Sequence, residues 1–310
     1  MLEEYSGYEI HFKTLKRIEH PLNFYDRYSI TIPCNITKIG DHAVSCHHEI
    51  VSITIPNSVR EIGNHAFGYC TSLTSIIIPN SVSKIGNFAF GGCISLKSVI
   101  LPNSIRKIGW NAFYNCSNIT SINIPNLING FNIHAFECCS NITSITIPNF
   151  VNNIGNNTFY SCDLKSITIP TSVKYIGDSA FEFCYNLESI TIPTSVSKIG
   201  KCAFKKCINL SFITIPDSVR EIGRSTFEHC SNLSSITIPD SITKIGRCAF
   251  SNCSNLTSIF IPDFVTKIGQ YAFENCISLT SITIPCFAPN PVEYYNTTFE
   301  NCPNLKYTFY

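Results

Sequence analysis

Proline recurs along this chain at a nearly constant spacing. Successive prolines are 23 residues apart, with one interval of 22 between Pro148 and Pro170. They stand at positions 33, 56, 79, 102, 125, 148, 170, 193, 216, 239, 262 and 285. A fixed period of this size is typical of stacked supersecondary units. The sequence therefore predicts a repeat solenoid of about 12 coils, in which no coil buries its apolar side without its neighbours.

Each unit reads like residues 73–93, LTSIIIPNSVSKIGNFAFGGC. The segment before the proline alternates polar and apolar residues and is rich in β-branched side chains, which predicts a short strand with one buried face. Proline ends this strand because it has no N–H to donate. The Val-x-x-Ile segment predicts a second short extended piece. The apolar spacing in Ala-Phe-x-x-Cys-x-x-Leu predicts a helical turn.

A glycine follows the second extended piece in almost every unit, as in Gly63 and Gly86. One unit carries Asn132 at this place instead. Asparagine tolerates a left-handed backbone better than other residues with a side chain. We therefore expect a positive φ at this corner of each coil.

Composition narrows the classes of function. The hydrophobic fraction is 44% and the formal net charge is +1, so the chain can fold but has no global attraction for nucleic acid. No apolar stretch is long enough to span a bilayer as a helix, so we expect no transmembrane segment. The first residues have neither a basic nor an apolar region, so a standard secretory signal is not expected.

The repeat pattern Leu-x-x-Ile-x-Ile-Pro-x-x-Val-x-x-Ile-Gly-x-x-Ala-Phe-x-x-Cys resembles the BspA-like leucine-rich repeat, also called the Treponema pallidum type. The likeness extends over about residues 29–310. It implies a right-handed arc with a parallel β-sheet on the concave side and short extended segments and helical turns on the convex side. It also implies a role in adhesion, since family members are often surface antigens of bacteria and parasitic protists.

The two ends depart from the repeat and define the expected domains. Residues 1–28 do not match the unit and are predicted to cap the first coil, because an open solenoid must cover its first apolar layer. Residues 29–285 are predicted to form the solenoid. Residues 286–310 form an irregular, aromatic last repeat that we expect to act as the second cap.

Cysteine occupies one position of the repeat. Equivalent side chains in neighbouring coils point in parallel, which disfavours disulfides, and a free cysteine packs as a small apolar residue. We therefore expect buried, structural thiols and a reducing compartment. These thiols belong to Cys70, Cys93, Cys116, Cys139, Cys162, Cys184, Cys207, Cys230, Cys253 and Cys276.

The outward positions of the predicted strands are mostly Ser and Thr, and the exceptions are candidates for binding. Large exposed apolar side chains on a sheet often mark contact sites. The alternative is drift at tolerant surface positions. The candidates are Ile77, Ile100, Asn123, Phe212 and Phe260.

A second candidate surface is a basic edge at one repeat position, interrupted by Glu61 and Glu221. A solvated edge that keeps the chain soluble is one reading, and docking to acidic glycans or lipid headgroups is the other. The edge consists of Lys38, Lys84, Lys107, Lys198, Lys244 and Lys267.

Residue types that carry catalysis or bind cofactors form no convergent pattern. His47, His48 and Glu49 near Cys46, with His42 and His65 in one column, are the one grouping of metal-ligand types. A polar N-terminal edge is the simpler interpretation. We expect no catalytic residues, no metal and no cofactor.

The leading hypothesis is a non-enzymatic scaffold or surface adhesin that binds a protein or glycan through the concave sheet. The alternative is an intracellular interaction or structural protein. The missing signal favours the cytoplasm and the family resemblance favours the cell surface. The partner and the oligomeric state stay open.

Overall fold

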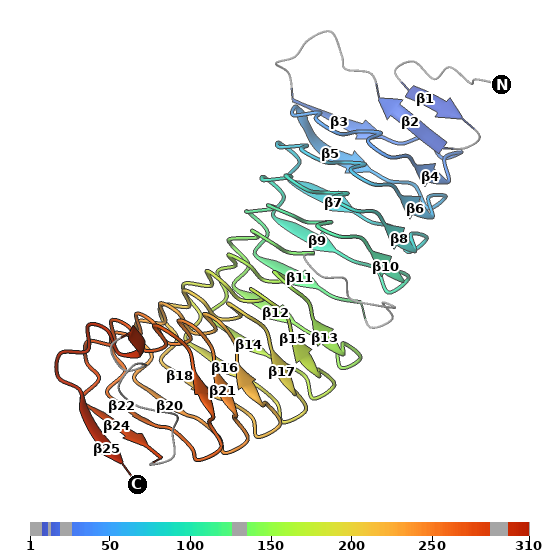
Figure 1. Cartoon of the computed structure of the whole chain (residues 1–310). Helices are drawn as coiled ribbons and strands as arrows, with labels where there is room; N and C mark the ends of the chain where they lie inside the picture. Colours follow the sequence, from blue (N-terminus) through green and yellow to red (C-terminus); the bar gives the residue numbers. More distant parts are fainter. Residues whose placement is uncertain (1–7, 12–13, 19–26, 126–134, 286–296, 310) are drawn as a thin grey trace. The chain divides into compact units, whose positions relative to one another are not determined.

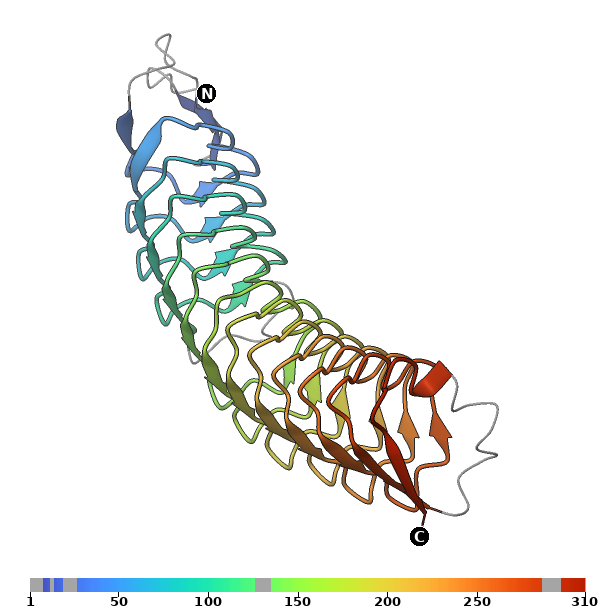
Figure 2. The same cartoon turned by 90° about the vertical axis from the view of Figure 1, so that its left-hand side faces the viewer.

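The computed structural model describes residues 8–11, 14–18, 27–125, 135–285 and 297–309. The chain divides into two compact units, Met1–Pro148 (unit 1) and Asn149–Tyr310 (unit 2). Within each unit the repeats stack coil upon coil, with one repeat per coil (Figure 1). Equivalent strands of successive coils lie side by side in both views (Figure 2). In the described ranges no helix combines the length and the apolar character that crossing a membrane requires.

Unit 1 contains two parallel sheets. The strand before each proline forms what we call the strand face, with strand order β12-β11-β9-β7-β5-β3. Its strands are β3 (Tyr28–Thr31), β5 (Ile50–Thr54), β7 (Ser75–Ile77), β9 (Ser98–Ile100), β11 (Ser121–Asn123) and β12 (Ser144–Thr146). The second extended piece of each coil forms what we call the edge ladder. Its two-residue strands are β4 (Lys38–Ile39), β6 (Glu61–Ile62), β8 (Lys84–Ile85) and β10 (Lys107–Ile108).

Unit 2 repeats this plan with interruptions. Its strand face has the orders β14-β16-β18-β20 and β22-β24-β25, and its edge ladder has the orders β13-β15-β17 and β19-β21-β23. The face strands are β14 (Ser166–Thr168), β16 (Ser189–Thr191), β18 (Phe212–Thr214), β20 (Ser235–Thr237), β22 (Ser258–Phe260), β24 (Ser281–Ile284) and β25 (Lys306–Phe309). The ladder strands are β13 (Asn153–Ile154), β15 (Tyr175–Ile176), β17 (Lys198–Ile199), β19 (Glu221–Ile222), β21 (Lys244–Ile245) and β23 (Lys267–Ile268).

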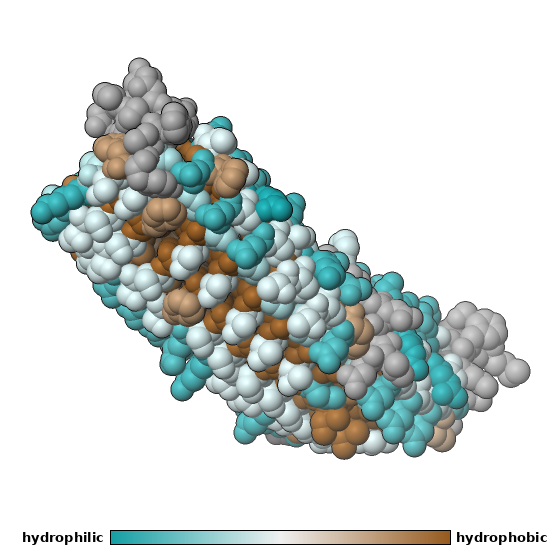
Figure 3. All heavy atoms as spheres, turned by 90° about the horizontal axis from the view of Figure 1, so that it is seen from below, coloured by the Kyte–Doolittle hydropathy of each residue, from teal (hydrophilic) through white to brown (hydrophobic). Residues whose placement is uncertain are grey.

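The core consists of identical residues stacked in columns. Strand register pairs Ile53 with Ile76, so each buried isoleucine packs on its equivalent in the next coil. Phe67 and Phe90 are fully buried, and their rings stack with centroids 5.2 Å apart. Because equivalent residues repeat at each coil, apolar and small residues run in alternating rows over the surface as well (Figure 3).

The corner glycines have a different purpose from the one expected. No corner glycine in the described residues has a positive φ, so the prediction of a left-handed corner is wrong. A Cβ atom on Gly40 would lie 2.7 Å from the Leu15 carbonyl oxygen, and one on Gly246 would lie 2.6 Å from the Arg224 nitrogen. At such corners glycine is required because the backbones of adjacent coils approach each other closely. Gly223 is an exception, since the nearest atom to a Cβ there would be 3.3 Å away.

The segment after the corner is a series of turns, and α-helix is described at residues 297–298 alone. Left-handed backbone occurs here at residues with side chains, such as His65 (φ 50) and Tyr69 (φ 59). The N–H of Phe67 donates to the Ala89 carbonyl of the next coil at 2.8 Å, while the N–H of Gly68 donates back to His65 at 2.9 Å. The N–H groups thus donate in turn to the next coil and to a residue earlier in the same coil, and this satisfies the backbone hydrogen bonds without a helix.

Both ends extend the stack. At the start, β1 (Tyr8–His11) and β2 (Thr14–Ile18) form an antiparallel hairpin, and β2 pairs in parallel with β4. The buried Leu15 covers the first coil of the edge ladder. At the other end, β25 pairs with β24, and the ring of Phe299 stacks on Phe273 at 5.2 Å. The rest of both predicted caps lies outside the described residues.

Candidate functional site

The strand face of unit 1 carries two large apolar side chains among small ones. Ile77 on β7 and Ile100 on β9 are directly paired in the parallel register. They are 79% and 73% exposed, while the neighbouring outward residues Ser75 and Ser98 are small. The pair therefore forms an apolar step on an otherwise polar sheet.

Phe212 and Phe260 lie on the strand face of unit 2, where Tyr307 and Phe309 of β25 are exposed aromatic residues as well. Phe212 on β18 is 55% exposed, and Phe260 on β22 is 49% exposed. They are two coils apart, with β20 between them. Phe264, which follows β22 after a proline, is also exposed, and sequence reasoning overlooked it because it lies in a turn.

Asn123 differs from the other predicted contact residues. Its side-chain amide donates to the Leu101 carbonyl at 3.0 Å and its amide oxygen accepts the Leu101 N–H at 3.2 Å. Both polar groups of the side chain therefore hold β11 to the preceding coil. The Asn123 side chain is exposed, but its polar groups are already bonded to the neighbouring coil.

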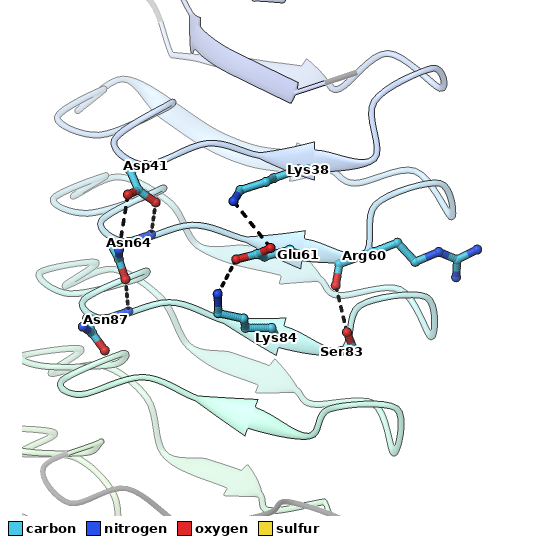
Figure 4. Close-up of polar contacts among 8 residues, drawn as sticks. All are labelled: Lys38, Asp41, Arg60, Glu61, Asn64, Ser83, Lys84 and Asn87. Carbon is cyan, nitrogen blue, oxygen red and sulfur yellow. Dashed lines mark hydrogen bonds and ion pairs between the residues drawn. The ribbon is translucent and has the colours of Figure 1, made fainter. Parts of the chain in front are cut away.

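The basic edge coincides with the edge ladder, since its lysines begin β4, β8, β10, β17, β21 and β23. In unit 1, Glu61 lies between Lys38 at 3.5 Å and Lys84 at 2.5 Å (Figure 4). Burial raises the pKa of Glu61, but the Lys84 hydrogen bond and the two ammonium charges lower it overall. In this part of unit 1 the cations are neutralised by a carboxylate one coil away.

The corner after the ladder carries a column of side-chain acceptors that sequence reasoning missed. The Asp41 carboxylate accepts the N–H of Asn64 at 2.8 Å, and the Asn64 amide oxygen accepts the N–H of Asn87 at 2.8 Å (Figure 4). Asn156 and Asp178 repeat this arrangement in unit 2, where Asp178 accepts the N–H of Lys201. The recurrence of Asp and Asn one residue after the corner glycine was the available signal.

The edge ladder of unit 2 is open between β17 and β19. Lys198 of the basic edge begins β17 on one side of the opening, Glu221 begins β19 on the other side, and Lys244 begins the next strand, β21. Lys244 pairs with Glu221 at 2.6 Å, whereas the ammonium group of Lys198 lies over the Tyr175 ring at 5.4 Å. A hollow of about 610 Å³ lies at the opening. We call this place the ladder gap.

The predicted structural thiols are free and buried. Most donate the S–H group to a backbone carbonyl of the preceding coil, as Cys93 does to Phe67 at 3.1 Å and Cys230 to Phe204 at 3.1 Å. Burial raises the pKa of Cys70 and of Cys184 to about 12. Such thiols are unreactive and serve packing and hydrogen bonding.

The histidine grouping is divided between the interior and the surface, because His47 is buried while the other histidines lie at or near the surface. The rings of His42 and His65 stack at 4.7 Å, and His65 stacks on Phe88 at 4.9 Å. His48 contacts the Thr71 hydroxyl at 3.2 Å. Across the described ranges, no three side chains of His, Cys, Asp or Glu come together as a metal site.

The profile of the BspA type leucine rich repeat region matches the chain over residues 13–82, 60–188 and 174–306, with six copies. No curated protein sequence matches it at a significant level. The family match therefore covers most of the chain.

Several solved structures are similar over nearly all of this chain. A leucine rich cell surface protein from Faecalibacterium prausnitzii A2-165 is 27% identical, with a TM-score of 0.69, and the match covers 99% of this chain and 95% of that chain. A leucine-rich repeat protein from Bacteroides ovatus ATCC 8483 is 24% identical, with a TM-score of 0.63 and coverage of 100% and 97%. The pneumococcal vaccine antigen PcpA is 20% identical, with a TM-score of 0.57 and coverage of 96% and 77%. For the Bacteroides ovatus protein and PcpA, the likeness shows a shared fold alone.

Proposed function

This chain belongs to the BspA-type leucine-rich repeat family, and on that premise we propose that it is a non-enzymatic scaffold that binds a protein partner through the strand face. The observation that carries the proposal is the paired exposure of Ile77 and Ile100 on adjacent strands. Apolar side chains exposed together on a flat, polar sheet lower the free energy when a partner covers them. Phe212 and Phe260 supply aromatic anchors on the same face of unit 2.

The test is capture of partners by the immobilised full chain, followed by cross-linking and identification of the cross-linked residues. We expect Ile77→Ser combined with Ile100→Ser to abolish capture of the partner cross-linked at β7 and β9. A matched control is Ile94→Ser, since Ile94 is also exposed but lies in a turn segment. Retained capture by the double variant, or equal loss in the control, would contradict the proposal. The melting temperature should stay unchanged in all variants.

We further propose that the chain is displayed on the cell surface, as an adhesin. The similar protein from Faecalibacterium prausnitzii is described as a cell surface protein. The alternative is an intracellular interaction protein, which the free thiols favour because reducing compartments preserve them. Antibody labelling of intact cells would support display, and labelling that requires permeabilisation would support the alternative.

A further inference from the structure

The ladder gap leaves buried backbone groups without the partners that equivalent groups have. The N–H of Gly200 donates to Ile176 and the N–H of Gly246 donates to Ile222, both at 2.8 Å. Within the described segment 197–224, no such bond joins Gly223 to Ile199. Gly223 is buried, and buried N–H groups almost always have an acceptor. The gap therefore needs an acceptor from outside the chain.

The gap is local, because the rest of both coils stays stacked. On one side of it, β16 and β18 pair in register. On the other side, the N–H of Cys202 donates to the Arg224 carbonyl at 2.9 Å. The coils therefore hold the opening in a fixed shape between two intact seams.

Cations surround the opening. Lys198, Lys201 and Arg220 line the hollow together with the carboxylates of Asp178 and Glu221. Both carboxylates have partners at its margin, since Asp178 accepts the Lys201 N–H at 2.8 Å and Glu221 pairs with Lys244 at 2.6 Å. The positive charges of the lining, three against two, thus exceed the negative ones.

A threonine coincides with the gap. Thr226 occupies the fully buried column that Ala66, Ala203 and Ala249 fill elsewhere, and its hydroxyl donates to the Gly223 carbonyl at 3.0 Å. This side chain is larger than alanine in a tightly packed column, and we attribute the opening of the ladder to this extra volume.

We propose that the ladder gap binds a tetrahedral oxyanion of the phosphate type, held by the backbone N–H group of Gly223 and by the side chains of Lys198, Lys201 and Arg220. A backbone N–H donor beside cationic side chains is an arrangement that recognises phosphate and sulfate groups. The oxyanion supplies the acceptors that the open ladder lacks. The site lies on the edge ladder and is independent of the strand face.

The test is calorimetric titration of the full chain with inorganic phosphate at constant ionic strength. Glycerol phosphate and inorganic sulfate are titrated in parallel, to distinguish an esterified phosphate and a sulfate from free phosphate. We expect saturable binding, weakened at least about tenfold by Arg220→Met or Lys201→Met. Arg60→Met is the matched control, since Arg60 lies in the same local sequence beside a closed ladder, and it should leave the Kd unchanged.

A second variant tests the shape of the site without removing charge. Thr226→Ala should close the ladder and weaken phosphate binding at least about tenfold. Thr158→Ala removes an equivalent hydroxyl, bonded to the Gly155 carbonyl at 2.9 Å, and should bind as the wild type does.

Three results would overturn the proposal. The first is the absence of saturable binding by the wild type, which would mean that water fills the gap. The second is unchanged binding by Arg220→Met. The third is equal weakening by Arg60→Met, which would indicate diffuse charge attraction. The strand-face variants Ile77→Ser and Ile100→Ser should bind phosphate normally, so this proposal and the proposed function can fail separately.

Discussion

The hexapeptide Ser-Val-Arg-Glu-Ile-Gly occurs twice, at residues 58–63 and 218–223, and its edge ladder is closed in one place and open in the other. In unit 1, the Gly63 N–H donates to Ile39 at 2.9 Å, and Glu61 contacts lysines on both sides. In unit 2, Gly223 lacks the equivalent bond, and Glu221 forms its ion pair with Lys244 of the following coil. An identical strand sequence thus does not decide whether the ladder forms.

The deciding residues lie outside the hexapeptide. The preceding corner carries Asp41 in unit 1, which accepts the Asn64 N–H at 2.8 Å. The equivalent residue in unit 2 is Lys201, which has only donors and faces the like charge of Arg224. The buried column behind the corner carries Ala66 in one coil and Thr226 in the other. An acceptor at the corner is not required for closure, since Gly246 and Gly269 donate to Ile222 and Ile245 although Arg224 and Arg247 stand at the preceding corners. The small residue behind the corner is the difference that goes with closure.

The largest expected difference is in amide hydrogen exchange. The Gly63 amide is bonded within a closed ladder, while the Gly223 amide faces the gap, so Gly223 should exchange on the order of 100-fold faster or more. Exchange measured by NMR on the full chain without phosphate tests this. Equal protection at both glycines would show that the gap is closed in solution. In Thr226→Ala, Gly223 should approach the protection of Gly63.

The converse substitution tests the cause in unit 1. Ala66 is fully buried, so Ala66→Thr inserts a hydroxyl and a methyl group into a packed column and should lower the free energy of unfolding by about 1–3 kcal/mol. Urea denaturation measures the loss, and exchange at Gly63 shows whether the ladder has opened. Ala66→Gly is the control for altering the column without adding volume. If Ala66→Thr is destabilised while the Gly63 amide stays protected from exchange, the added volume disturbs the packing without opening the ladder.

Much of the fold was predictable because it repeats. The spacing of the prolines fixes the coil length, and the alternation in Ser-Ile-Thr-Ile predicts the strand that BspA-type repeats share. Burial of the cysteine column could be predicted in the same way, since Cys93 and Cys116 recur beside an invariant phenylalanine. Twelve internal copies replace the comparison of many sequences.

What could not be predicted depends on contacts between coils. The corner glycines are required by backbone approach, not by their φ angle, and a sequence does not distinguish these reasons. The predicted helical turn is a series of turns because its N–H groups find carbonyls in the next coil, as Phe67 finds Ala89. The ladder gap coincides with a threonine, Thr226, in a column mostly filled by alanine, and the role of that column appears only when the coils are stacked.

The buried cysteines of the repeat allow a test of whether the ladder gap admits water to the core. Burial raises the pKa of Cys70 to about 12 and also raises that of Cys230. The unfolded chain loses these protons near pH 9 and the folded chain does not. Each thiol therefore contributes stability that is full below pH 9 and falls by about 1.4 kcal/mol per pH unit above it, until the folded pKa is reached.

We expect Cys70→Ala and Cys230→Ala to flatten this alkaline decline by the same amount in urea denaturation. The S–H of each donates to the preceding coil, at 3.0 Å for Cys70 and 3.1 Å for Cys230, so both coils are closed at this depth. A smaller change for Cys230→Ala would mean that water enters through the ladder gap and reaches the thiol.

The smallest expected effect concerns the two glutamates of the repeated hexapeptide. Glu61→Gln should destabilise by about 0.2–1 kcal/mol, and Glu221→Gln by less, because Glu61 contacts two lysines and the ion pair of Glu221 is with one. The pKa of Glu61 lies below its usual 4.5, so its contribution is present above that pH and is lost as the pH falls through the folded value. Urea midpoints at neutral pH and below 4.5 measure both effects. A larger loss for Glu221→Gln would mean that Glu221 bridges the gap to Lys198, and that the edge ladder is closed by its side chains even where its backbone is open.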